Sequence, residues 1–184
     1  QTLNGAQTLA INTTGATTFK GAVGETTALT SLTTNAGGSV AINGGGVTTT
    51  GAQTYNDEVT LGAATVLSST GAGDITLGST LNGAQTLAIN TTGATTFTGA
   101  VGGTTALTSL TTNAGGTLAI NGGLVRTTGA QTYGEVATLG ADTTLRGVNV
   151  AFASTIDSVS STPFSLTISD SGTTILGGSV GALH

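Results

Sequence analysis

The stretch TLNGAQTLAINTTGATTF occurs twice in this chain, at residues 2–19 and again at residues 80–97. The two copies belong to a 78-residue repeat, in which residues 2–63 match residues 80–141 at 52 of 62 positions. After about residue 141 the second copy diverges from the first. Long internal repeats are typical of solenoids, in which each unit buries its apolar side chains only by stacking on its neighbours.

A shorter period lies inside the 78-residue repeat. Apolar residues that open similar strings recur at an 18–21-residue spacing, which corresponds to about nine repeat units. These residues are Leu9, Leu29, Val47, Leu67, Leu87, Leu107, Val125, Leu145 and Leu166. A unit of about 20 residues is too short for a helical hairpin or a propeller blade, but it suits one turn of a β-helix. We therefore expect four turns in each 78-residue repeat, with Leu9 stacked directly on Leu29.

Alternating apolar and polar residues indicate which side chains point inward. In strings such as Val40-Ala41-Ile42, every second residue is apolar, as in a strand with one buried face. Gly and Asn between the strings tolerate positive φ and mark the corners. We expect the intervening Thr residues, such as Thr60, in solvent, and the Tyr hydroxyls near the surface or a polar corner. The residues expected to point inward are Ile11, Val40, Ile42, Leu61, Ile75, Leu77, Phe19 and Phe97.

These patterns predict an all-β fold, a single-stranded parallel β-helix (β-solenoid) of about nine coils, each of roughly 18–21 residues. We expect one continuous solenoid: residues 1–79 form the first repeat, residues 80–157 the second, and residues 158–184 a further partial coil or coils. Nine coils stacked at about 4.8 Å would give a rod core of roughly 40 Å.

The composition excludes several classes of protein. Charged residues make up 6% of the chain, and Thr or Gly interrupts every apolar run before it reaches the length of a membrane helix. The three basic residues, Lys20, Arg126 and Arg146, are too few and too scattered in the sequence to bind nucleic acid. The absence of Cys excludes a disulfide framework and a thiolate metal site. Gln1 opens directly into a repeat, so we expect the chain to be an internal part of a longer protein.

Several strings resemble the β-strand repeats of large bacterial surface adhesins and exoproteins related to filamentous haemagglutinin, of the two-partner secretion type. They are SLTTNAGGSVAINGG at residues 31–45, SLTTNAGGTLAINGG at 109–123, TTGAQTY at 49–55 and 127–133, and TLGADTTL at 138–145. The resemblance implies a right-handed parallel β-helix shaft at the bacterial cell surface, exported through an outer-membrane secretion partner. It also implies a role in adhesion, biofilm or surface filaments, and it transfers no catalytic residue.

Candidate catalytic and metal-binding motifs are weak. The GGSVG string at residues 177–181 fits the GxSxG pattern, but a nucleophile elbow needs an Asp and a His after the Ser. Here only His184 follows, and no acidic residue does. Asp57-Glu58 is the one adjacent acidic pair, and Gly71-Ala72-Gly73-Asp74 resembles a calcium-binding turn that does not recur. We expect both to be solvated corners.

The sequence therefore predicts no catalytic, cofactor-binding or metal-binding residues and no enzymatic activity. The N-glycosylation sequons at Asn12 and Asn90 are expected by chance in a Thr-rich chain. We expect Asn12, Asn43, Asn90 and Asn121 to form corner hydrogen bonds. The expected function is a non-catalytic structural or adhesive shaft of a secreted bacterial surface protein.

The alternative function is a self-assembling extracellular fibre, built by end-to-end stacking of solenoids. Expected partners are a further copy of the chain, end to end or side by side, and a ligand on a host or cell surface. Ice binding by rows of Thr is a minor alternative, because the Thr pairs occupy different phases of the 18–21-residue period.

Overall fold

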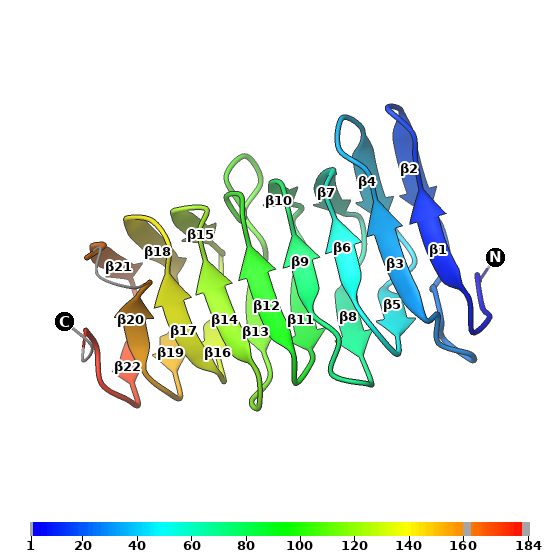
Figure 1. The fold of residues 1–184 in the computed structure, drawn as a ribbon. Coiled ribbons are helices and arrows are strands. Elements are labelled where there is room, and N and C mark those ends of the chain that lie inside the picture. The colour runs from blue at the N-terminus through cyan, green and yellow to red at the C-terminus, as the bar shows by residue number, and fades with distance from the viewer. Residues whose placement is uncertain (1, 160–162, 182–184) are drawn as a thin grey trace.

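The computed structural model describes residues 2–159 and 163–181, and these residues form 22 β-strands and no helix. The strands stack side by side along one axis, with β1 at one end of the molecule and β22 at the other (Figure 1). Every pairing between these strands is parallel. The chain is therefore a parallel β-solenoid of about eight turns, close to the nine expected.

Each turn has three sides, so the strands form three faces. Face I is an eight-stranded sheet that runs the length of the molecule. Its strands are β1 (Thr8–Ile11), β3 (Ser31–Thr34), β6 (Gln53–Tyr55), β9 (Ile75–Leu77), β12 (Ala94–Phe97), β14 (Thr117–Ile120), β17 (Val136–Leu139) and β20 (Ile156–Ser158).

Face II consists of two sheets joined through Val101, which bridges Leu81 and Val125. Its first sheet contains β2 (Ala16–Phe19), β4 (Ser39–Ile42), β7 (Glu58–Leu61) and β10 (Leu81–Asn82), and its second contains β15 (Leu124–Arg126), β18 (Thr143–Gly147) and β21 (Leu166–Asp170).

Face III begins with Leu3, which forms an isolated bridge with Val23, and Val23 forms another with Val47. It continues through β5 (Gly46–Thr49), β8 (Thr65–Ser69), β11 (Thr86–Asn90), β13 (Ser109–Thr112), β16 (Gln131–Tyr133), β19 (Val150–Phe152) and β22 (Ile175–Leu176).

The stacking register differs from the one expected. Leu9 pairs with Leu32, whereas Leu29 forms a bridge with Thr49, so the predicted stacking of Leu9 on Leu29 is wrong. The length of a turn varies along the rod because its corners differ in length. One long corner follows Val23, where Gly24 has φ +72° and a Cβ would meet the Thr48 carbonyl oxygen at 2.1 Å. A fixed period in the sequence therefore could not give the register.

The 78-residue repeat is out of step with the turns. The string TLAI forms β1 on face I in the first copy, but it lies in β11 on face III in the second. Between them lie nine strands and the Val23 bridge, so the repeat covers eleven strand positions. A three-sided coil makes this three and two-thirds turns instead of the expected four. Each copy is therefore rotated by one face relative to the other.

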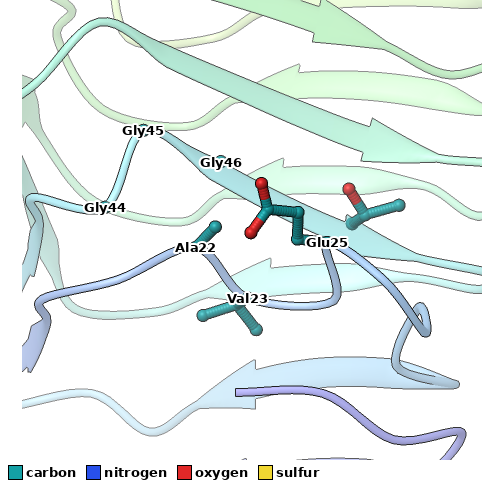
Figure 2. A pocket seen from close by; sticks show the side chains of 7 residues that line it. Ala22, Val23, Glu25, Gly44, Gly45 and Gly46 are labelled. Carbon is teal, nitrogen blue, oxygen red and sulfur yellow. The ribbon is translucent and has the colours of Figure 1, made fainter. Parts of the chain in front are cut away.

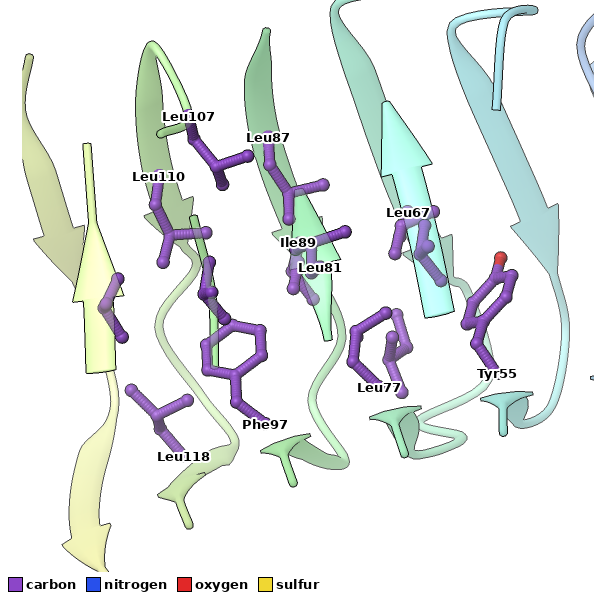
Figure 3. Packing of buried hydrophobic residues seen from close by; sticks show 14 of the residues in the cluster. Tyr55, Leu67, Leu77, Leu81, Leu87, Ile89, Phe97, Leu107, Leu110 and Leu118 are labelled. Carbon is purple, nitrogen blue, oxygen red and sulfur yellow. The ribbon is translucent and has the colours of Figure 1, made fainter. Parts of the chain in front are cut away.

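The core runs along the axis between the three faces, as Figure 3 shows for the central turns. Val40, Ile42, Leu61, Ile75 and Leu77 are buried as predicted, and Thr60 is exposed. Phe19 and Phe97 are also inside, while Ile11 is half-buried against the core. The alternation of side chains in the sequence therefore identified the inner side of these strands correctly.

The prediction for the tyrosines was wrong. Tyr55 and Tyr133 have no exposed surface, and their hydroxyls lie inside the coil. Several Thr side chains also point inward instead of facing solvent. They are Thr34, Thr49, Thr65, Thr91, Thr95, Thr112, Thr127 and Thr143. The interior therefore contains polar groups, and these need partners within the coil.

Candidate functional surfaces

The GGSVG string does not form a nucleophile elbow. Ser179 follows the short strand β22, and Val180 forms a parallel bridge with Ile156 on face I. The carbonyl oxygen of Ser179 accepts a hydrogen bond from Ile156 N at 2.9 Å, so the segment is an ordinary part of the coil. His184 lies outside the described residues. The strand–turn–helix setting that the motif requires is not formed by residues 163–181.

The two side chains of the acidic pair Asp57-Glu58 lie on opposite sides of the coil wall, one in the interior and one in solvent. Glu58 is exposed, but Asp57 is only 1% exposed, so its assignment to a solvated corner was wrong. Asp57 Oδ1 accepts a hydrogen bond from Gly38 N on the preceding turn at 2.7 Å. Asp74 does lie at an exposed corner, where Oδ1 accepts a bond from Ala94 N at 2.8 Å. Both carboxylates thus tie neighbouring turns together.

Glu135 occupies the position equivalent to Asp57, and it is also buried, with 2% of its surface exposed. Burial raises the pKa of Glu135 to about 7, and the nearby hydroxyls of Thr112 and Thr95 oppose the shift. Among the described residues, neither carboxylate oxygen accepts a hydrogen bond of good geometry, although the hydroxyls of Thr112 and Thr95 are close enough to lower the pKa of Glu135. The sequence contained a signal for this site, since an acidic residue follows each Tyr by two positions.

Each Tyr hydroxyl belongs to a buried hydrogen-bond network that we call the Gln-Tyr clamp. Tyr55 donates to Gln53 Oε1 at 2.9 Å, and Tyr133 donates to Gln131 Oε1 at 2.8 Å. Gln53 Nε2 then donates to the carbonyl oxygen of Ser68 on the next turn at 2.9 Å, and Gln131 Nε2 to that of Arg146 at 2.8 Å. The clamp therefore satisfies buried polar groups and connects successive turns.

Corner hydrogen bonds come from different Asn residues than expected. Asn35 Oδ1 accepts a bond from Thr13 N at 2.8 Å, and Asn113 Oδ1 accepts one from Thr91 N at 2.9 Å. Asn12 and Asn90, the residues of the two sequons, are exposed. The corner Asn residues bond the backbone of the preceding turn and contribute to stacking rather than to a binding site.

A hollow of about 370 Å³ opens at the corner between faces II and III in the first copy (Figure 2). Val23 lies at its base, the backbone of Gly44, Gly45 and Gly46 forms one wall, and Glu25 extends over it. In the second copy the equivalent residues are Gly103 for Glu25, Leu124 for Gly46 and Arg126 for Thr48. The corner of the first copy therefore carries a carboxylate, whereas the equivalent corner of the second copy, between faces I and II, has Leu124 and Arg126 in place of Gly46 and Thr48.

The outer side of face I carries a row of Thr. Strand pairing places Thr33, Thr54, Thr76 and Thr96 on four successive turns. The row continues through Ala119 to Thr138. The register predicted from the 18–21-residue period did not bring these Thr residues into one row. Cross-strand Thr pairs stabilise a sheet, so the row contributes to the ladder itself.

Among the described residues, no group of three or more His, Cys, Asp or Glu side chains is placed to hold a metal ion. Residues 2–159 and 163–181 also contain no helix that is long and apolar enough to cross a membrane. Comparison of the chain with family models, curated proteins and solved structures found no match.

Proposed function

We propose that this chain is a non-catalytic shaft, structural or adhesive, of a secreted bacterial surface protein. The observation that carries the proposal is the eight-stranded ladder of face I, which continues from β1 to β20 without a break. Each turn is bonded to both neighbours, so length is added by repeating one unit. The resemblance of the repeat strings to bacterial exoproteins supports the location at the cell surface.

The outer surfaces also fit a shaft. Small and hydroxyl side chains such as Thr33 and Thr54 face outward on face I, and charges are sparse. A polysaccharide-cleaving β-helix would instead need clustered acidic and basic groups on one face. Glu135, at the corner between β16 and β17, is a single acidic residue with 2% of its surface exposed, and it is not part of such a cluster.

Surface display tests the proposal. The chain would be placed between an outer-membrane anchor and an epitope, with a Gly/Ser linker of equal length as the control. A shaft holds the epitope at a fixed height above the anchor. Six strand pairings on face I separate Ala10 from Thr138, so this part of the shaft should contribute about 29 Å to that height. An epitope no more distant or accessible than with the flexible linker, or release of sugar from polysaccharides by the purified chain, would contradict the proposal.

The alternative, an end-to-end fibre, is favoured by the last described turn. Ile175, Leu176 and Val180 are 54%, 47% and 50% exposed, because no further described turn covers them. Another turn, from the same chain or from a second copy, would bury them, and open strand edges invite such pairing. Light scattering and electron microscopy would distinguish the two functions. Ordered filaments that disappear with Ile175→Lys would support the fibre, and monomers at high concentration would contradict it.

Ice binding remains a minor candidate because of the Thr row on face I. No second row of Thr runs beside it, because the adjacent outward positions on face I include Asp74 and Val136. Thermal hysteresis of the purified chain is the relevant measurement. Its loss in Thr54→Leu and Thr76→Leu variants would support ice binding, and no hysteresis in the wild type would exclude it.

A further inference from the structure

Two of the three basic residues of the chain lie side by side on face II. Arg126 in β15 pairs directly with Arg146 in β18, the strand of the next turn. Both side chains are exposed, and they point outward because the adjacent Val125 and Leu145 have no exposed surface. The two guanidinium groups therefore extend from neighbouring points, about 4.8 Å apart on the backbone.

This arrangement is unfavourable by itself. Like charges directly opposite each other on a sheet repel and destabilise the pairing. Among the described residues, neither arginine forms an ion pair with a carboxylate, and the one hydrogen bond to either guanidinium is a long one of 3.5 Å from Arg126 Nη1 to the Gly103 carbonyl oxygen. Most of the donors of both groups consequently face solvent.

The first copy of the repeat shows that the strands do not require arginine. The equivalent residues are Thr48 and Ser68, and these also pair directly, in β5 and β8 on face III. The second copy has thus replaced both members of one contacting pair with the same cation. In a chain with 6% charged residues, this is a concentrated change.

The buried Gln-Tyr clamp fixes the backbone beneath both positions. Gln131 Nε2 donates to the Arg146 carbonyl oxygen at 2.8 Å and to the Val125 carbonyl oxygen, next to Arg126, at 3.4 Å. Gln53 makes the same two contacts with Ser68 and Val47, at 2.9 and 3.2 Å. The two copies therefore offer the same rigid support for an outward pair, and only one copy places arginines on it.

We propose that Arg126 and Arg146 form a binding site for the carboxylate groups of an acidic polysaccharide. The guanidinium group is planar and presents paired donors that match a carboxylate bidentately. Thr144, Thr167 and Ser169 lie outward beside the pair on β18 and β21 and supply hydroxyls for sugar hydroxyls. This inference rests on the adhesive role proposed above and gives that role a ligand class.

A polysaccharide fits this surface better than an acidic peptide. The edges of β15 and β18 are already used by neighbouring turns, so no peptide can add to the sheet as a further strand. Thr144, Thr167 and Ser169 beside the pair carry short hydroxyl side chains, and a single partly exposed leucine, Leu124, does not form an apolar pocket for peptide side chains. A polymer that runs along the rod can place successive hydroxyls and carboxylates over successive turns.

The repeat supplies the test variants. Arg126→Thr with Arg146→Ser restores the residues of the first copy, and Lys20→Thr removes the remaining cation by the exchange already found at Thr98. Binding of polygalacturonate to immobilised chain would be measured at low and high salt, with methyl-esterified polygalacturonate as the neutral control. Circular dichroism and melting would verify that each variant is folded.

The expected result is loss of affinity by about tenfold or more in the double arginine variant, because charge-assisted hydrogen bonds are lost. Lys20→Thr should change affinity less than twofold. Thr48→Arg with Ser68→Arg, introduced into the double variant together with Glu25→Gly to match Gly103, should restore part of the binding on face III. The esterified polymer should not bind.

Unchanged binding in the double variant would overturn the proposal, as would an equal loss with Lys20→Thr, which would indicate a net-charge effect. Failure of the transplanted pair to restore binding in a folded variant would also count against it. Tighter binding of polyglutamate than of polygalacturonate would assign the site to an acidic peptide and contradict the polysaccharide. If the wild type adheres to cells while the arginine variants adhere equally well, the shaft proposal stands and this site fails alone.

Discussion

The two copies of the repeat have nearly the same sequence but lie on different faces of the coil. Tyr55 belongs to β6 on face I and Tyr133 to β16 on face III, yet both are fully buried and donate to the Gln two residues earlier. The comparison shows that the local sequence determines where a strand forms, where a corner lies and which side chains point inward. The face of the coil on which the segment lies does not change this. The three faces are therefore interchangeable supports, and the same string folds in the same way on any of them.

The ten differences between the copies are not spread evenly. Three of them, at residues 25, 46 and 48, change the hollow between faces II and III, and four more occur together at residues 56–59. Most other positions are identical. Two of the ten differences lie in the core, where Val40 and Val59 of the first copy correspond to Leu118 and Ala137 of the second. The others fall at outer positions, at corners and at one buried carboxylate.

The largest expected effect comes from placing a charge in the core of each copy. Ile42 on face II and Ile120 on face I are equivalent, and both have no exposed surface. Ile→Ala at such sites costs about 2–5 kcal/mol, and Ile→Asp should cost more because the charge is buried without a partner. Chemical denaturation should give similar losses for Ile42→Asp and Ile120→Asp. Very different losses would show that the faces are not equivalent.

The control for this prediction is Thr60→Asp, an outward position next to Leu61. It should change the free energy of unfolding by no more than about 0.5 kcal/mol. If Thr60→Asp is as damaging as Ile42→Asp, the inner and outer sides of these strands are exchanged.

The second effect is a pH dependence of stability that comes from Glu135, the buried carboxyl of the second copy. The raised pKa of Glu135, about 7, means that the folded chain holds this proton more tightly than the unfolded chain. The stabilisation from the neutral acid is therefore fully present below about pH 4.5 and is lost as the pH rises through about 7, a change of roughly 3 kcal/mol. Glu135→Gln, which stays neutral, should be more stable than the wild type at pH 8 and similar to it at pH 4.

Melting curves between pH 4 and pH 8 check this prediction. Glu58→Gln, at an exposed site, is the matched control and should change stability by no more than about 0.5 kcal/mol. A stability difference between Glu135→Gln and wild type that does not vary with pH would refute the assignment.

A smaller effect tests the Gln-Tyr clamp in both copies. Tyr55→Phe and Tyr133→Phe remove one hydroxyl each and leave a buried Gln oxygen without its donor. Each should lower the free energy of unfolding by about 1–3 kcal/mol, and the two losses should agree. The ring of Tyr133 stacks on Phe152 at 4.4 Å, and the Phe variant retains that contact. A loss of stability in only one of the two variants would show that the contribution of the clamp to stability depends on the face on which it lies.

The smallest effect is expected at the hollow. Gly46 has ordinary φ, and a Cβ there would meet nothing closer than the Val66 carbonyl oxygen at 3.7 Å. Gly46→Leu copies Leu124 of the second repeat and should alter stability by no more than about 0.5 kcal/mol. Gly44→Leu is the contrasting variant, because its Cβ would lie 2.0 Å from the Gly21 carbonyl carbon. Equal melting temperatures for the two variants would contradict this description of the corner.

The fold class and the inner side of the strands could be predicted from the sequence because alternation is a local property. The register could not, since the number of residues in a corner depends on how the loop packs, as after Val23. Without the register, the Thr row on face I and the contact between Arg126 and Arg146 could not be found. The buried Asp57 and Glu135 were missed because charged residues are normally placed in solvent, although their equivalent positions after Tyr were visible.

The register is the central claim, and cross-linking tests it most directly in a chain without native Cys. Ala88 in β11 pairs with Val66 in β8, whereas a 20-residue period would place it opposite Ser68. Parallel partners are about 4.8 Å apart, within disulfide range, whereas the diagonal position is about 7–8 Å away. Val66→Cys with Ala88→Cys should form a disulfide rapidly under mild oxidation, and Ser68→Cys with Ala88→Cys should not. The reverse result would contradict the three-and-two-thirds-turn repeat.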